Sequence, residues 1–380
     1  MRLLYLTRTY TLHDARWLRV LAEQGLELGF LPLQQVNDQD FARAHPTVEL
    51  LVSPGLPEGA ETAQLDGAEP HVRGLCKAWS PDVILAGPLT DAGYLAVHID
   101  SDRTLLMSWA FDVLHEPGNR AGARERLQVA LHRGRHLFTD CQALADQCQA
   151  LAGRKYANVC VLPWGLAAGD KPVPRTGRRQ QLGDEGAKVI IYTRGFEPVH
   201  QSLAVIEAFC RAHAQDCTLR LWLAGSGGMR DQVEKLVDAS GLRPVVRFLG
   251  QLDQSELAGC LGEADAYLTY SLSDGSSLSL LQAMHAGLSC IVSDLPGNRE
   301  WVTPRGGWLV PLGEPEALAR AIVEGGRLSA EAQAGIAAHN RLQVNQRADL
   351  AANLPRLLRT LHAVAGPARP AAAEPLSLAL

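Results

Sequence analysis

The sequence lacks the signals of several protein classes. None of its eight cysteines forms a C-x-x-C pair, so neither a zinc site nor a thioredoxin-like redox pair is indicated. No apolar run reaches the roughly 18 residues of a membrane span, and the apolar start of the chain is too short for a signal-peptide core. The formal net charge of −5 argues against general binding to nucleic acid. We therefore expect a cytoplasmic protein without a nucleic-acid partner.

Several catalytic signatures are also missing or weak. The G-x-S-x-G elbow of serine hydrolases is absent. Two D-x-D triplets, Asp38–Asp40 and Asp100–Asp102, have a spacing that binds metal in some enzymes but arises often by chance, so we expect no metal site. The glycine cluster Gly225–Gly228 stands alone in the middle of the second half of the chain, which does not argue for NAD.

What the sequence does contain is a regular alternation of short apolar runs and segments with helical spacing. This pattern predicts an α/β fold with parallel, doubly wound sheets. In the first half we expect strands at Arg2–Leu6, Leu28–Leu31, Val48–Val52, Val83–Ala86 and Thr104–Trp109. We expect helices at Asp14–Gln24 and Gly93–Ile99, and the runs Arg133–Thr139 and Val159–Pro163 complete this half. In the second half we expect strands at Lys188–Thr193, Leu219–Ala224, Val245–Leu249, Ala266–Tyr270 and Ser289–Ser293. We expect helices at Ser202–His213, Met229–Ser240, Ser255–Leu261, Ser277–Ala286 and Glu314–Glu324.

The interruption between the two halves predicts the domain organisation. Residues 169–186 are rich in glycine, proline and charge, and form the best linker in the chain. We expect a Rossmann-like domain over 1–168 and a second one over 187–345. A C-terminal helix over 346–364 is expected to pack back on the first domain. The Pro/Ala-rich residues 365–380 are expected to be a disordered tail.

The most informative stretch is Ser271–Val302. A polar loop runs directly into a predicted helix, whose free N–H groups and dipole favour an anion such as a diphosphate. Asp274 stands eight residues before Gln282, roughly two helical turns, so the two side chains could meet opposite ends of one ligand. On local physics alone, Ser and Asp serving merely as helix N-caps explains this loop equally well.

An ordered set of motifs nevertheless resembles one family. The sequence is similar to the large family-four group of retaining glycosyltransferases, known as glycosyl transferases group 1. The resemblance extends to about Val364 and implies a GT-B fold, in which two Rossmann-like domains with parallel sheets face a central cleft. The matching stretches are P-D-V-I-L-A at Pro81–Ala86, S-W-A-F-D-V-L at Ser108–Leu114, V-L-P-W-G at Val161–Gly165, Y-T-R-G-F-E-P-V-H at Tyr192–His200, L-A-G-S-G-G-M-R at Leu223–Arg230, F-L-G-Q-L at Phe248–Leu252, and Ser271–Val302.

The resemblance assigns roles to individual residues. It implies that Asp274 contacts the transferred sugar, that Arg194 neutralises the donor diphosphate, and that Asp112, near Trp109, lies in a loop on the acceptor side. These three are the predicted catalytic residues. Gln282 is expected to hold the ribose, and Gly225, Ser226 and Gly227 to let the backbone approach the donor. The predicted donor-binding residues are Gly225, Ser226, Gly275, Ser276, Ser277, Leu278 and Gln282.

The sequence also departs from the family pattern. The family usually has Glu where this chain has Asp274 and Gln282. Asp keeps the charge with a shorter reach, and Gln keeps an acceptor while gaining a donor. The Lys that often follows the Arg is absent, and Val199 and His200 stand there instead. His200 or Lys235 are candidates to substitute for it.

Together these features predict a retaining, metal-independent glycosyltransferase of hexosyl or related type. The expected donor is a UDP-, GDP- or ADP-sugar with no further cofactor, and the expected acceptor is a carbohydrate or lipid-linked hydroxyl in bacterial glycan or glycolipid synthesis. Peripheral contact with the inner membrane would use the basic segment Arg124–Arg135, although a solvated surface is the better explanation of that segment. One alternative is a catalytically weak or inactive homologue that binds a nucleotide sugar or supports a partner enzyme. Another is a sugar-nucleotide epimerase of the same fold.

Overall fold

The chain forms two compact units that are not simple halves of the sequence. The computed structural model describes residues 1–108, 110–163, 165–167 and 177–366. The first unit comprises residues 1–139, 144–161 and the described residues from Pro355 onward, and the second comprises 140–143 and 162–354. Residues 169–176 of the predicted linker and nearly all of the predicted tail lie outside the described residues. The predicted domain boundaries, and the cleft predicted between the sheets, stay predictions.

The first unit is built on one parallel sheet of seven strands. Their order is β3-β2-β1-β4-β5-β6-β7, so the order reverses between β1 and β4. The strands span Arg2–Thr7 (β1), Glu27–Pro32 (β2), Val48–Leu50 (β3), Val83–Gly87 (β4), Thr104–Met107 (β5), His136–Thr139 (β6) and Asn158–Val161 (β7). All neighbouring pairs are parallel. The β2 strand ends at Pro32, which has no N–H to give to a ladder.

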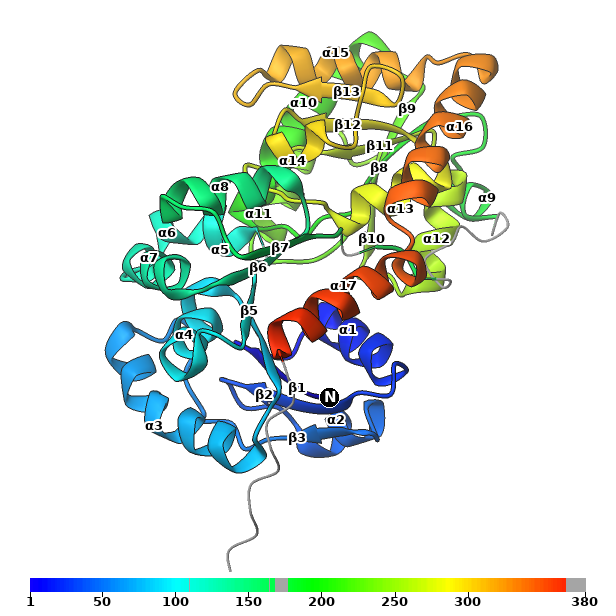
Figure 1. Cartoon of the computed structure of the whole chain (residues 1–380). Coiled ribbons are helices and arrows are strands. Elements are labelled where there is room, and N and C mark those ends of the chain that lie inside the picture. The colour runs from blue at the N-terminus through cyan, green and yellow to red at the C-terminus, as the bar shows by residue number, and fades with distance from the viewer. Residues whose placement is uncertain (109, 164, 168–176, 367–380) are drawn as a thin grey trace, which may run out of the picture. The chain divides into compact units, whose positions relative to one another are not determined.

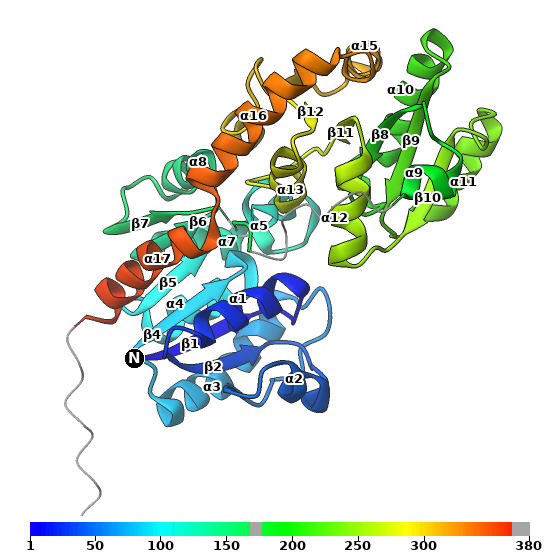
Figure 2. The same ribbon diagram turned by 90° about the vertical axis from the view of Figure 1, so that its right-hand side faces the viewer.

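Helices cover both faces of this sheet. In β1, Leu4 and Leu6 pack in one core cluster with residues of α3, whereas Tyr5 points to the opposite face and meets α1. Figures 1 and 2 show α1 and α3 on opposite sides of β1 and β2. The helices span Leu12–Ala22 (α1), Asp38–Ala44 (α2), Thr62–Trp79 (α3), Leu89–Gly93 (the π-helical turn η1), Tyr94–Asp100 (α4), Phe111–Leu114 (α5), Glu116–Asn119 (α6), Ala123–Arg133 (α7), Gln142–Ala152 (α8) and Leu350–Ala365 (α17).

The start of α1 buries a carboxylate. Thr11 caps the helix, and Asp14 closes a capping box by accepting the Thr11 N–H at 2.7 Å. The other Asp14 oxygen accepts the Tyr5 hydroxyl at 2.7 Å. Asp14 is fully buried, and this burial raises its pKa to about 6, although the hydrogen bonds from Thr11 and Tyr5 oppose the rise.

We expect Asp14 to make the first unit less stable as pH rises. Its folded-state pKa of about 6 exceeds the ordinary aspartate value of 3.8, so the native state holds the proton to higher pH than the unfolded chain does. The free energy of unfolding should therefore fall between those two pH values and then level off. Melting curves from pH 4 to pH 8 should show this fall in wild type and not in Asp14→Asn. Asp38→Asn, at an exposed first-turn position of α2, is the control, and parallel wild-type and Asp14→Asn curves would contradict the expectation.

The second unit repeats the doubly wound pattern with six parallel strands. Their order is β10-β9-β8-β11-β12-β13, which reverses between β8 and β11. The strands span Lys188–Tyr192 (β8), Leu219–Ala224 (β9), Val246–Gly250 (β10), Ala266–Thr269 (β11), Ser289–Ser293 (β12) and Gly307–Val310 (β13). The predicted α/β class with two parallel sheets is confirmed.

Alternate residues of β8 enter different cores. Ile190 and Tyr192 belong to one cluster with α10, α11 and α15, and Val189 and Ile191 belong to another with α12, α13 and α16. Figure 2 shows α10 and α11 on one side of β8 and β9, with α12 and α13 on the other. The helices span Arg178–Leu182 (α9), Pro198–His200 (η3), Ser202–Gln215 (α10), Arg230–Ala239 (α11), Gln254–Glu263 (α12), Leu278–Ala286 (α13), Pro296–Arg299 (α14), Pro315–Gly326 (α15) and Ala330–Arg347 (α16).

The described end of the predicted linker packs onto the second unit. Asp184 is almost fully buried and accepts hydrogen bonds from Trp222 Nε1 and Arg247 Nη2, each at 2.9 Å. Arg179 pairs with Asp265 at 2.6 Å. Residues 177–186 are therefore tied to this unit by buried polar contacts. Across the described part of the chain, no helix is both long and apolar enough to cross a bilayer.

Candidate functional site at the switch point of the second sheet

The predicted donor residues gather where the strand order of the second sheet reverses. Arg194 follows the carboxyl end of β8, and Asp274 lies in the loop that joins β11 to α13. The strands β8 and β11 are hydrogen-bonded neighbours. Loops that follow adjacent strands on either side of such a reversal form the crevice in which ligands bind to open α/β sheets.

Arg194 is held by the loop at the start of α13. Its Nη1 donates to Ser277 Oγ at 2.8 Å and to Ser279 Oγ at 3.2 Å. Its Nη2 lies 3.3 Å from Asp274 Oδ2. The guanidinium is thus fixed by three groups from one loop–helix junction, and its planar fork of donors suits an oxyanion such as a diphosphate.

Arg194 and Asp274 depend on each other for their charge. Their side chains are 17% and 11% exposed, so both are largely desolvated. Burial raises the pKa of Asp274, and the Arg194 guanidinium partly lowers it again. Burial also lowers the pKa of Arg194, but Asp274 outweighs this with help from Tyr267 and Tyr192, so the Arg194 pKa is raised overall. Each group therefore favours the charged form of the other across their 3.3 Å contact.

His200 joins this cluster in the position where the family usually has a lysine. Its Nδ1 lies 3.4 Å from Arg194 Nη2 and 3.2 Å from Ser271 Oγ. Lys235, the other candidate replacement, is exposed on α11. The structure therefore brings His200, and not Lys235, into contact with Arg194.

The start of α13 shows that Ser277 does more than cap a helix. Ser277 is the N-cap residue, yet its side chain makes no capping hydrogen bond and its hydroxyl accepts from Arg194 instead. Ser276 is buried and accepts the Trp301 indole N–H at 2.8 Å. Leu278 begins the helix, and Gln282 is 8% exposed on it. The purely capping explanation of Ser277 is therefore wrong.

The predicted glycine turn follows β9 and lies against the loop that carries Arg194. Phe196 N donates to Ser226 O at 2.9 Å, and Gly228 N donates to Glu197 Oε1 at 2.9 Å. A Cβ on Gly225 would overlap the Arg194 carbonyl oxygen, and a Cβ on Gly227 would lie 2.6 Å from Glu197 Oε1. The glycines are therefore required for close approach of these two loops, whatever they do toward a ligand.

Asp112 lies in the first unit and is completely buried. One of its oxygens accepts the Leu89 N–H at 2.6 Å, and the other accepts the Ser108 hydroxyl at 2.9 Å. These contacts fix the turn that follows β4, which is a positioning role. The catalytic role assigned to Asp112 stays a prediction. Trp109 lies outside the described residues.

The basic segment Arg124–Arg135 is not a uniformly exposed face. Arg126 is 1% exposed and donates from Nε to Thr90 O at 2.7 Å. Arg135 is exposed and pairs with Asp102 at 2.9 Å. Arg126 is used for internal contacts, and membrane contact through the rest of this segment stays a prediction.

Sequence reasoning missed the polar groups behind Arg194. Tyr267, on β11, shares a hydrogen bond of 2.9 Å with Ser279, which itself bonds Arg194. The run of serines at the start of α13 could have indicated Ser279, but Tyr267 reads only as a buried strand residue. Within the described residues, no three His, Cys, Asp or Glu side chains gather in a way that would hold a metal ion.

Comparison with known proteins places this geometry in a family. A model of the family "Glycosyl transferases group 1" matches residues 175–325. The GtfA subunit of a UDP-N-acetylglucosamine–peptide N-acetylglucosaminyltransferase from Limosilactobacillus reuteri is 32% identical over 112 residues, 29% of this chain and 21% of that protein. A phosphatidyl-myo-inositol mannosyltransferase from Mycolicibacterium smegmatis is 29% identical over 141 residues, 37% of this chain and 36% of that protein. The matches thus span only about a fifth and a third of these relatives.

Solved structures resemble nearly the whole chain. The Anabaena protein HepE in complex with UDP and glucose has a TM-score of 0.77 at 19% identity, covering 95% of this chain and 99% of that one. Sucrose-phosphate synthase from Thermosynechococcus elongatus also has a TM-score of 0.77 at 19% identity, covering 96% and 100%. The family match falls within the second unit, and both sheets follow the arrangement of these structures. The chain therefore has a GT-B fold, and its second unit is similar to the glycosyl transferases group 1 family.

Proposed function

We propose that the protein is a glycosyltransferase that moves a sugar from a nucleoside-diphosphate sugar to an acceptor hydroxyl, in bacterial glycan or glycolipid synthesis. The observation that carries this proposal is the guanidinium of Arg194, fixed by Ser277 and Ser279 at the switch point of the second sheet. A UDP sugar is the first donor to test, because HepE was solved with UDP-glucose and the GtfA relative is named for UDP-N-acetylglucosamine.

The proposed chemistry is the same-face substitution that the family resemblance implies. The bond between the anomeric carbon and the phosphate oxygen breaks, and the acceptor oxygen bonds to the same face of that carbon. The acceptor proton passes to the departing phosphate. Arg194 stabilises the negative charge that grows on the diphosphate, which is most effective where the cation is already held in place. Asp274 keeps Arg194 charged and oriented through their 3.3 Å contact.

Retention and metal independence belong to the proposal. No side chain is required as a nucleophile when the leaving phosphate accepts the proton, and Arg194 supplies positive charge that a metal ion would otherwise provide. The anomeric configuration of the product, read by NMR, tests the first point. Activity that is unchanged by EDTA would support the second.

A thermal-shift screen against UDP, GDP, ADP, CMP and dTDP sugars tests the donor site. A ligand at about a hundred times its Kd should stabilise the fold by roughly 2.7 kcal/mol. We expect a UDP sugar to raise the melting temperature of wild type and of Arg211→Ala, which removes a partly exposed ion pair with Glu316 in the same unit. Arg194→Ala should abolish the rise.

If no nucleotide shifts the melting temperature, the transferase proposal fails. If a nucleotide sugar binds and no acceptor is glycosylated, the catalytically inactive homologue becomes the better description. The Asp274/Gln282 pair, which replaces two glutamates of the family pattern, motivates that second candidate.

A further inference from the structure

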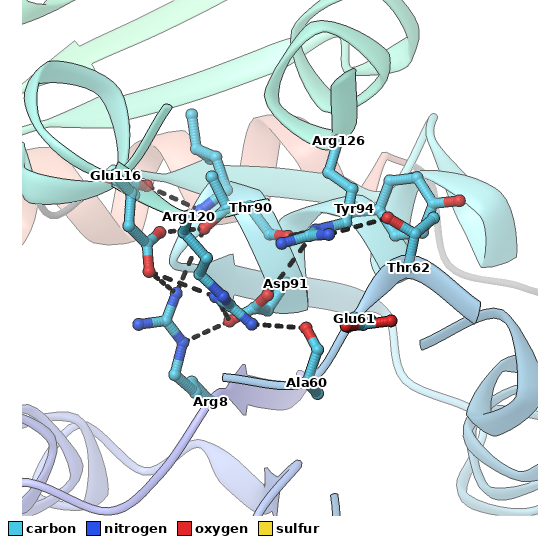
Figure 3. A network of polar contacts seen from close by, with 12 residues as sticks. Arg8, Ala60, Glu61, Thr62, Thr90, Asp91, Tyr94, Glu116, Arg120 and Arg126 are labelled. Carbon is cyan, nitrogen blue, oxygen red and sulfur yellow. Dashed lines mark hydrogen bonds and ion pairs between the residues drawn. The ribbon is translucent and has the colours of Figure 1, made fainter. Parts of the chain in front are cut away.

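A second charged cluster lies at the switch point of the first sheet. Arg8 directly follows β1, whereas Thr90 and Asp91 follow β4 on η1. Glu116, Arg120 and Arg126 come from α6, its C-cap and α7 after β5. We call these six residues the Arg8–Asp91 network (Figure 3). The carboxyl ends of β1 and β4 are where an open α/β sheet of this order binds ligands.

Two arginines share the same two carboxylates in this network. Arg8 donates from Nη2 to Glu116 Oε1 at 2.6 Å and from Nε to Asp91 Oδ2. Arg120 donates from Nη1 to Asp91 Oδ2 at 2.9 Å and to Glu116 Oε1 at 3.2 Å. Arg120 also donates to Ala60 O at 2.6 Å. The two guanidinium groups are thus held side by side over one pair of oxygens.

The network carries one positive charge more than it has negative charges, and its two most accessible side chains are arginines. Three guanidinium groups meet only two carboxylates. Asp91 and Glu116 are 2% and 5% exposed and Arg126 is 1% exposed, whereas Arg8 is 24% and Arg120 15% exposed. The acids are therefore buried beneath the arginines, and the surface that a ligand would meet is cationic.

Arg8 keeps donor capacity that its internal partners do not use. Its Nε donates to Asp91, and its Nη2 donates to Thr90 and Glu116. Figure 3 shows the remaining nitrogen, Nη1, pointing away from both carboxylates, with no interaction drawn to the labelled residues. Arg8, Asp91 and Arg120 line a small pocket together with apolar residues, among them Leu33, Leu56 and Ala60. The Nη1 group of Arg8 can therefore donate a hydrogen bond to an anion at the wall of this pocket.

The Arg8–Asp91 network does more than join the loops of the first unit through balanced ion pairs. Arg8, Arg120 and Arg126 together carry one charge more than Asp91 and Glu116, and Arg126 is held in place by Thr90 O and by Thr62 Oγ1 at 2.8 Å. The Asp112 carboxylate fixes Leu89, which precedes Thr90, so the loop that carries Asp91 is preorganised. Preorganised cations bind an anion with little loss of side-chain entropy.

We propose that Arg8 and Arg120 bind an anionic group, a carboxylate or a phosphate, on the acceptor. Asp91 and Glu116 act as positioning residues that hold both guanidinium groups at one pair of carboxylate oxygens. The inference rests on the proposed function in one respect, because it takes the occupant of this site to be the glycosyl acceptor. It narrows the acceptor from any hydroxyl compound to one that carries negative charge, either a uronic-acid sugar or a sugar phosphate.

Calorimetric titration of the full chain with three sugars tests the proposal. Glucuronate presents the carboxylate, glucose 6-phosphate presents the phosphate, and glucose is the neutral control. We expect saturable binding of at least one charged sugar, weakening as salt is raised, and no comparable binding of glucose. Whichever charged sugar binds more tightly identifies the source of the anion. Equal binding of glucose, or no binding of either charged sugar, would overturn the proposal.

Arg8→Gln should weaken binding of the charged sugar by about tenfold or more, which corresponds to roughly 1.4 kcal/mol. The matched control is Arg135→Gln, which removes one cation from the same unit at an exposed ion pair with Asp102. Arg8→Lys retains the charge and should restore part of the affinity, a rescue that a merely structural role does not predict. Equal affinities of Arg8→Gln and Arg135→Gln for the charged sugar would contradict the proposal.

A parallel titration with UDP separates the two proposals. UDP binding depends on Arg194 in the second unit and should be the same in wild type, Arg8→Gln and Arg135→Gln. If charged sugars bind and UDP does not, the transferase proposal fails while the anion site stands. If UDP binds and the charged sugars do not, the anion site fails and the donor site stands.

Discussion

Replacing Arg194 with alanine is expected to lower kcat/KM for the nucleotide sugar by about 10²- to 10³-fold, the usual cost of removing a preorganised group from the stabilisation of developing negative charge. The loss has two sources. The diphosphate loses its bidentate partner, and Asp274 loses the cation that lowers its pKa. Steady-state kinetics with the donor found by the thermal-shift screen measures the effect.

Two further variants separate these sources. Arg194→Lys keeps the positive charge near Asp274 but loses the fork whose Nη1 reaches the two serines while Nη2 reaches Asp274. Its activity should therefore lie between those of wild type and Arg194→Ala. Arg211→Ala, whose ion pair with Glu316 lies away from these residues, should retain wild-type kinetics. Full activity of a well-folded Arg194→Ala protein would remove Arg194 from the mechanism.

Gly225→Ala is expected to reduce activity strongly even though a methyl group adds no charge. The new Cβ would overlap the carbonyl oxygen of Arg194, so either the glycine turn or the Arg194 loop must move. Overpacking of this kind costs about 1–3 kcal/mol of stability. A displacement of a catalytic group by about 1 Å can lower the rate by 10²-fold. Kinetics and melting temperature measured on the same preparation give both effects.

Gly228→Ala provides the matched control within the same turn. The nearest heavy atom to a Cβ at Gly228 is Glu197 Oε2 at 3.7 Å, an ordinary contact distance. We expect this variant to be close to wild type in both stability and turnover. Similar losses in Gly225→Ala and Gly228→Ala would mean that the turn is sensitive to any substitution, and the specific contact with Arg194 would then lose its importance.

Local sequence patterns predicted the strands well because most of them are buried on both faces. Lys188–Tyr192 and Ser289–Ser293 are short apolar runs whose ends are visible in the sequence. The helices α3 and α16 were not predicted. Pro70 lies inside α3, where proline normally argues against a helix, and α16 has few buried residues to mark an apolar face. The β13 strand was not predicted either, because it begins at Gly307 and glycine disfavours strands.

The candidate sites show a different limit. Arg194 and Asp274 are 80 positions apart, and only the family resemblance suggested that both belong to one donor site. Local physics offered capping as an equal explanation of Ser277, which the contact with Arg194 overturns. Arg8 and Asp91 meet at a separation of 83 positions, because β1 and β4 are adjacent in a sheet whose order is not the sequence order. Pairing of this kind becomes visible only once the topology is known.

The division of the chain into units has a consequence for biosynthesis. The first unit is interrupted after Val161 and receives its last helical segment only from Pro355 onward, where Leu357 and Leu361 are fully buried. Nearly all of the second unit is contiguous and leaves the ribosome earlier. The ribosome adds roughly 5–20 residues per second, so the N-terminal sheet lacks this covering segment for tens of seconds after its own synthesis. A newly made chain is therefore expected to complete its second unit first, and its N-terminal core last.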